Sequence, residues 1–162
     1  MPLIVWTNRM SVGVKLLDND HRKMMLLINE LHEDLMTGHT KPALDRIFER
    51  LVRHTRTHFA HEEQLFAETS YPGAEAHKQE HVQMIDQLRT LQARLIAADE
   101  ISTDIEVMDR LRDWLFGHVL SSDREYVPHL QTQEVDPLLA AWAIPEKLQK
   151  DTAALDTGAR PV

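Results

Sequence analysis

The stretch HFAHEEQLF, residues 58–66, places two histidines and two glutamates within six positions of the chain. His58 and Glu62 are four residues apart, so on an α-helix they share one face. The stretch HKQEH, residues 77–81, repeats this spacing with a histidine at each end. Such side chains either face water on a helix surface or meet inside a bundle of helices, and the surrounding sequence distinguishes the two.

Length and composition exclude several classes of protein. A chain of 162 residues is long enough to bury one domain core, and its net charge of −8 argues against binding to nucleic acid or anionic membranes. The absence of cysteine removes disulfides, thiolate zinc sites and iron–sulfur clusters. No apolar run reaches the ~20 residues that cross a bilayer, and the first residues lack the features of a secretion signal. We therefore expect a cytoplasmic monomer without membrane insertion.

Apolar residues recur at three- and four-residue steps, and the chain contains only 5 glycines. Both features predict helices. The predicted helices cover residues 18–36, 43–68 and 74–98, with a fourth from about residue 103. Short connections between amphipathic helices favour an all-α, up-down-up-down four-helix bundle.

Two segments lie outside the predicted helices. Residues 1–17 predict an extended N-terminal arm, and the bundle domain ends near residue 130. Residues 131–162 form a C-terminal extension, in which Pro137–Trp142 predicts a short helix that is followed by a loose tail.

The spacing of the histidines along the chain predicts that they meet. Antiparallel helices joined by a short loop bring residues equally far from the loop to the same height, because each residue rises about 1.5 Å. The point midway between the pair at 58 and 62 and the pair at 77 and 81 falls in a predicted turn. The midpoint between His21 and His58 also falls in a predicted break between helices. So does the midpoint between the pair at 77 and 81 and His118. Four helices are therefore predicted to deliver histidine to one level of the core.

Asp123 belongs to this level only under one condition. It follows His118 by five residues, which places it about 140° away around a straight helix. It can face the same site if the helix ends or widens into a π-type turn there, as helices often do at functional sites. Ser121 and Ser122 favour such an irregularity. The alternative for every one of these side chains is a satisfied core or surface residue without a ligand.

Five imidazoles and two carboxylates exceed the ligand set of one metal ion. They suit two octahedral ions that share a bridging hydroxide, with one position left open for a small diatomic ligand. Imidazole with bridging oxygen suits iron better than zinc, which prefers four ligands, or magnesium, which prefers oxygen. A ferritin-like diiron site needs Glu-x-x-His on two helices and a zinc protease needs His-Glu-x-x-His, and neither pattern occurs.

The combined pattern resembles the bacterial hemerythrin family over roughly residues 5–130. The residues that carry the resemblance are Trp6, Gly13, Asp18-Asn-Asp-His21, His58-Phe-Ala-His-Glu62-Glu63, Tyr71-Pro72, His77-Lys-Gln-Glu-His81 and His118-Val-Leu-Ser-Ser-Asp123. Each motif alone is weak evidence for the family, whereas the combined pattern is specific to it. The resemblance implies a four-helix bundle with a non-haem diiron site that binds O2 reversibly.

The resemblance also assigns the ligands. It implies one iron held by His77, His81 and His118, and a second iron, with the open position, held by His21 and His58. It implies that Glu62, Asp123 and an oxo or hydroxo group bridge the two ions. Trp114 and Leu115 precede His118 by one turn, where family members line the oxygen pocket, although plain core packing explains them equally well.

Other polar residues near the ligands have weaker interpretations. Asp18 either orients His21 or caps its helix, and we favour the cap. His54 lies one turn before His58 and either hydrogen-bonds near the site or is a satisfied core histidine. His61 and Glu63 lie off the inward face, so we expect them to be solvated.

The expected function is O2 transport, storage or delivery, with O2 as ligand and an O2-consuming enzyme as recipient, rather than catalysis. Two alternatives share the same site. One is a diiron oxidoreductase that acts on peroxide or nitric oxide, and the other is a sensor of O2 or iron. The ligand pattern does not separate them.

Overall fold

The structure, a computed structural model, describes residues 1–99 and 101–135. Its helical elements are η1 (Asn8–Met10), α1 (Lys15–Met36), α2 (Lys41–Thr69), α3 (Ala74–Ala97), α4 (Ile101–Gly117), η2 (His118–Ser122) and α5 (Asp123–Gln131). The element η2 is a π-helical turn that joins α4 to α5 without a break in the helical path.

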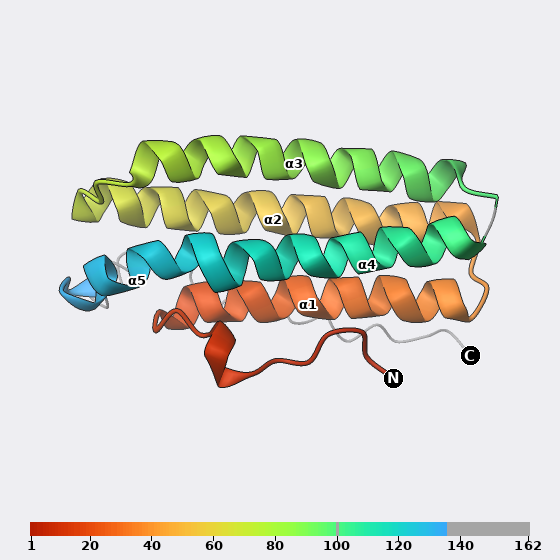
Figure 1. The fold of residues 1–162 in the computed structure, drawn as a ribbon, viewed down its shortest axis with the longest axis horizontal. Helices are drawn as coiled ribbons and strands as arrows, with labels where there is room; N and C mark the ends of the chain where they lie inside the picture. Colours follow the sequence, from red (N-terminus) through yellow and green to blue (C-terminus); the bar gives the residue numbers. More distant parts are fainter. Residues whose placement is uncertain (100, 136–162) are drawn as a thin grey trace, which may run out of the picture.

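The predicted all-α, up-down-up-down bundle is confirmed. Figure 1 shows α1 to α4 side by side, each running opposite to the one before it, with α5 continuing the line of α4. Contacts between α1 and α4 close the bundle. Among the described residues, no helix is both long and apolar enough to cross a membrane.

The first helix begins earlier than its apolar pattern predicted. It starts at Lys15 rather than near residue 18, so the arm is shorter than expected. Gly13 has a φ of +77°, a conformation that side chains other than glycine rarely adopt, and this turn directs the chain into α1. Leu17 is then already fully buried, which fixes the first turn of the helix against the core.

The arm lies against α1 and is not a loose tail. The side chain of Asn29 accepts a hydrogen bond from the backbone N–H of Ile4 at 2.8 Å. It also donates one to the backbone carbonyl oxygen of Ile4 at 2.8 Å. The Arg22 guanidinium lies 4.1 Å from the centre of the Trp6 ring, a cation–π contact. Ile4 itself is 3 % exposed. The arm therefore covers the outer face of α1.

Apolar side chains form two clusters with polar residues between them. The larger one, which we call the main core, runs through α1 to α4 and includes Leu31, Leu51, Leu95 and Leu111. The smaller one, the end core, gathers Leu17, Leu65, Phe66, Tyr126, Leu130 and neighbours from the arm and α5. Along α1, His21 stands between Leu17 of the end core and Met24 of the main core.

The C-terminal extension is only partly described. Val135 packs into the end core. The predicted short helix at Pro137–Trp142 and the loose tail after it lie outside the described residues. The domain boundary near residue 130 therefore stays a prediction.

Candidate metal centre

The structure brings all seven candidate ligands to one level of the bundle. They come from α1, α2, α3, η2 and α5, and each is between 0 and 5 % exposed. Buried carboxylates and imidazoles are costly unless they bind a partner. Their positions are His21, His58, Glu62, His77, His81, His118 and Asp123.

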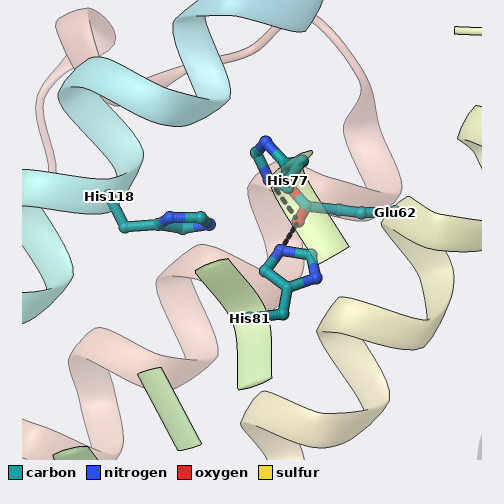
Figure 2. A group of neighbouring side chains, drawn as sticks. All are labelled: Glu62, His77, His81 and His118. Carbon is teal, nitrogen blue, oxygen red and sulfur yellow. Dashed lines mark ion pairs between the residues drawn. The ribbon is translucent and has the colours of Figure 1, made fainter. Parts of the chain in front are cut away.

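One group of four donors has three histidines. Glu62, His77, His81 and His118 each offer a ligand atom, and these atoms all lie within 4.8 Å of one another. Figure 2 shows the imidazoles of His77 and His81 on either side of the Glu62 carboxylate, with the His118 ring pointing at the same space. Glu62 Oε2 is 3.0 Å from His81 Nε2 and 3.5 Å from His77 Nε2.

The second group has two histidines and two carboxylates. His21, His58, Glu62 and Asp123 also offer atoms that lie within 4.8 Å of one another. The Nε2 atoms of His21 and His58 face each other at 3.0 Å. Asp123 Oδ2 is 3.1 Å from His21 Nε2, and its Oδ1 is 2.9 Å from His118 Nε2. Glu62 belongs to both groups and Asp123 contacts both, so the two carboxylates lie between them.

Asp123 reaches the site through the irregularity that its spacing requires. Residues His118–Ser122 form a π-helical turn, which winds the chain so that positions five apart share a face. Ser121 Oγ donates to the carbonyl oxygen of Gly117, and Ser122 Oγ donates to Glu80 Oε1 at 2.6 Å. The predicted widening of the helix is confirmed.

The donor atoms at the centre fit a bound cation. Several of them are buried and form no hydrogen bond with any residue that the structure describes: Glu62 Oε2, both carboxylate oxygens of Asp123, and Nε2 of His77, His81 and His118. A buried polar atom without a partner costs about 1–3 kcal/mol. Nitrogen and oxygen donors of this kind are ligands for divalent transition metals. The arrangement therefore suits two metal ions with shared carboxylates.

The carboxylates also control the protonation of the histidines. Burial lowers the pKa of His58, but Glu62, Asp20 and Asp123 outweigh burial and raise it to about 10. Burial likewise opposes protonation of His77, while Asp123 and Glu62 raise its pKa to about 9. Burial raises the pKa of Glu62, yet the imidazoles hold it well below its ordinary value. Protons and metal ions therefore compete for the same nitrogen atoms.

Three further carboxylates bind the outer nitrogen atoms of the histidines. Asp20 Oδ2 lies 3.3 Å from His58 Nδ1, Glu63 Oε1 lies 2.8 Å from His81 Nδ1, and Glu80 Oε1 lies 3.0 Å from His118 Nδ1. Asp20 lies on α1, Glu63 on α2 and Glu80 on α3, whereas their histidine partners lie on α2, α3 and η2. Such contacts fix the tautomer and the orientation of a ligand imidazole.

Sequence reasoning missed these three carboxylates. Asp20 and Glu80 received no interpretation, and the expectation that Glu63 is merely solvated was wrong. A signal was available, because each of them is adjacent in sequence to a candidate ligand. An interhelical contact of this kind cannot be read from the periodicity of one helix.

The interpretation of His61 as solvated was also wrong. Its Nδ1 lies 2.7 Å from Asp20 Oδ2, and its side chain is 26 % exposed. His54 Nε2 lies 3.0 Å from the carbonyl oxygen of Asp20, and burial lowers the pKa of His54. His54 is thus a satisfied, neutral histidine beside the site. Both histidines hold the segment of α1 that carries Asp20.

Tyr126 contacts the site, although the spacing of the candidate ligands along the sequence did not predict it. Its ring is fully buried in the end core, and its hydroxyl donates to Glu62 Oε1 at 2.6 Å. Glu62 is the carboxylate that the two donor groups share, so this hydrogen bond contacts both groups through one residue. It holds Glu62 in the orientation that serves both groups.

Neither interpretation of Asp18 was correct. Its carboxylate accepts hydrogen bonds from Ser11 Oγ at 2.6 Å and from the Val12 N–H at 2.8 Å. Within the described part of the chain, the Nδ1 atom of His21 has no hydrogen-bond partner, and α1 begins at Lys15 without a side-chain cap. The early start of α1 moves Asp18 into the helix, where it anchors the arm.

The two residues predicted to line an oxygen pocket lie in different surroundings. Leu115 is 2 % exposed and belongs to the main core. Trp114 is half-buried beside a surface hollow between α3 and α4. Its indole Nε1 is buried and has no hydrogen-bond partner among residues 1–99 and 101–135. A role of Leu115 and Trp114 in an oxygen pocket stays a prediction.

Comparisons with known proteins agree with this geometry. Residues 12–130 match the Hemerythrin HHE cation binding domain. The bacteriohemerythrin of Stenotrophomonas maltophilia is 31% identical over 131 residues, which cover 81% of this chain and 84% of the relative. The bacteriohemerythrin of Clostridium acetobutylicum is 28% identical, covering 77% of this chain and 99% of the relative.

More distant relatives share the fold. The myohemerythrin of Sipunculus nudus is 27% identical over 75% of this chain and 89% of its own length. The crystal structure of a wild-type hemerythrin superposes with a TM-score of 0.69 and 27% identity, covering 79% of this chain and 98% of that one. Sequence, fold and site chemistry point the same way, and the chain belongs to the hemerythrin family.

Proposed function

We propose that the chain binds O2 reversibly at a non-haem diiron site, for oxygen storage or for delivery to an O2-consuming enzyme. The observation that carries this proposal is the pair of buried donor groups that share Glu62. The membership of the hemerythrin family supports it. The chain's acidic composition is compatible with a small neutral ligand rather than a polyanion.

The ligand assignment follows from the two groups. His77, His81 and His118 would hold one iron, and His21 with His58 would hold the other. Glu62 and Asp123 would bridge them, together with an oxo or hydroxo group. The second group has one imidazole fewer, so an ion held there would have a coordination position free for O2. When bound, the iron pair supplies that position and the electrons that make O2 binding reversible.

The protein side chains would keep the site ordered and dry. Tyr126 holds one oxygen of Glu62 at 2.6 Å, and Asp20, Glu63 and Glu80 hold the outer nitrogens of three histidines. The end core closes the site on one side, and the main core closes it on the other. Excluding water in this way protects bound O2 from protons that would expel it in reduced form.

A spectroscopic experiment tests the proposal. The metal-free protein is loaded anaerobically with two equivalents of Fe2+ and is then exposed to air. We expect a visible charge-transfer band that appears in air, bleaches under vacuum and returns over repeated cycles. Continuous consumption of added peroxide or nitric oxide, without a stable band, would instead support the oxidoreductase alternative and contradict the proposal.

A further inference from the structure

The bundle encloses the centre on all sides. The seven candidate ligands are 0 to 5 % exposed, so an ion has to pass through the helical wall to reach them. Divalent ions carry a tightly held water shell that a polar donor must help to remove. A route of access for iron is therefore part of any function that needs the loaded centre.

One hollow on the described surface leads towards the centre. It lies between α3 and the α4–η2 segment, has a volume of about 530 Å³, and includes His118 in its wall. Glu80, Asp113 and amide side chains such as Gln83 line it, and no lysine or arginine of the described residues does. This lining favours a cation. Asp113 lies 3.0 Å from Arg112, whose positive charge offsets its own, whereas the partners of Glu80 are His118 and Ser122.

Glu80 connects this hollow to the centre. Its side chain is 39 % exposed, and its Oε1 lies 3.0 Å from His118 Nδ1 and 2.6 Å from Ser122 Oγ. His118 is itself 3 % exposed. On the other side of the ring, His118 Nε2 lies 2.9 Å from Asp123 Oδ1. One imidazole ring therefore separates a solvent-facing carboxylate from the inner donor atoms.

We propose that this hollow is the route by which ferrous iron reaches the centre, with Glu80 as the carboxylate that takes up the ion before it passes to His118. The proposal rests on the proposed function for the identity of the ion. A carboxylate oxygen is a suitable first donor for a hydrated divalent cation. His118 stands in the π-helical turn, which departs from regular α-helical hydrogen bonding, as helices often do at functional sites.

Glu63 provides a matched comparison inside the same protein. Like Glu80, it contacts the outer nitrogen of a ligand histidine, with 2.8 Å to His81 Nδ1, and it is 35 % exposed. It does not line the hollow. The two carboxylates thus share the orienting contact and differ in their position relative to the proposed route.

The test measures the rate of iron uptake by the full-length protein. Metal-free protein is mixed anaerobically with Fe2+, a chelator stops the reaction at intervals, and bound iron is counted. Uptake by Glu80→Gln should be about tenfold slower than uptake by Glu63→Gln, because both variants lose an orienting charge and only one loses the proposed first donor.

A second pair of variants leaves the histidine partners untouched. Gln83→Arg places a positive charge in the hollow, one turn from Glu80, and should slow uptake by about tenfold while the final iron content stays at that of the wild type. Gln64→Arg adds the same charge on α2, outside the hollow, and should leave the rate unchanged. Equal rates for Gln83→Arg and Gln64→Arg, or for Glu80→Gln and Glu63→Gln, would overturn the proposal.

These outcomes are separable from the proposed function. Wild-type protein that binds two iron ions and shows no reversible band in air refutes O2 binding and leaves the uptake route in place. Wild-type protein that shows the band, with all four variants loading at one rate, refutes the route alone.

Discussion

The main core and the metal centre are built on the same helices by opposite chemistry. On α3, His81, Leu88 and Leu95 follow one another at intervals of seven residues on one stripe, and all three are buried. Leu88 and Leu95 contact other apolar side chains of the main core. His81 contacts Glu62 at 3.0 Å and Glu63 at 2.8 Å. A single helical face therefore changes from a dry core to a ligand set within two turns.

The difference shows how stability and function are divided along the bundle. Each fully buried leucine contributes about 1.5–3 kcal/mol through the apolar surface it removes from water. The centre buries carboxylates and imidazoles, whose removal from water is unfavourable without a partner. We infer that the main core supplies the folding energy that holds the ligands in place before metal arrives. Variants in the two regions should therefore have separable effects.

The largest effect is expected at the carboxylate that both donor groups share. Glu62→Ala should reduce bound iron from two ions to at most one per chain, because both groups lose an oxygen donor. Elemental analysis after loading and desalting measures this. The exposed Glu33→Ala on α1 serves as the control and should keep two ions. Retention of two ions by Glu62→Ala would refute the bridging assignment.

The reverse pattern is expected in the main core. Leu95 is 0 % exposed and lies fourteen residues from His81, about 21 Å along α3. Leu95→Ala should lower the free energy of unfolding by about 2–5 kcal/mol through lost burial and a residual cavity. Denaturant unfolding measures the loss, and iron content at low temperature should equal that of the wild type. If Leu95→Ala kept the wild-type free energy of unfolding but bound less iron, stability and iron binding would not be divided between the two regions.

Tyr126 lies where the end core meets the metal centre, so its effect should be smaller. Tyr126→Phe keeps the buried ring and removes the hydrogen bond to Glu62. Loss of such an outer contact typically weakens metal binding by about 10- to 100-fold. Competition with a chelator measures the affinity. Tyr71→Phe is the matched control, since its ring lies 6.5 Å from that of Tyr126 in the same aromatic cluster. Equal affinities in the two variants would contradict the role of Tyr126.

The smallest effect is expected from pH acting on chelator-treated, metal-free protein. Folding raises the pKa of His58 to about 10 and that of His77 to about 9, above the value of 6.5 in the unfolded chain. The stabilising ion pairs are therefore complete below about pH 6.5 and are lost as pH rises through 9 to 10. The Tm should fall by several degrees over this range. Iron-loaded protein should not show this fall, because its imidazoles bind metal instead of protons.

The helical pattern was sufficient for the fold and for the meeting of the donor side chains, because both depend on spacing along one chain. The mirror relation across each loop predicts that His21, His58 and His118 lie at one level, and the structure places them there. The five-residue step to Asp123 required a π-helical turn, and the structure contains one.

The outer partners could not be predicted in this way. Glu63 contacts His81 from α2, and Glu80 contacts His118 from α3. Such pairs depend on the rotation and separation of two helices, which the pattern of either helix alone does not determine. Asp18 shows the same limit, since its partners Ser11 and Val12 belong to an arm whose path no periodicity describes.

Anomalous diffraction at the iron edge from crystals of the loaded protein tests the central claim most directly. We predict two iron peaks inside the bundle, one contacted by His77, His81 and His118 and the other by His21 and His58, with Glu62 and Asp123 between them. A single peak, or iron bound only at the surface while the imidazoles turn away from one another, would contradict the shared centre.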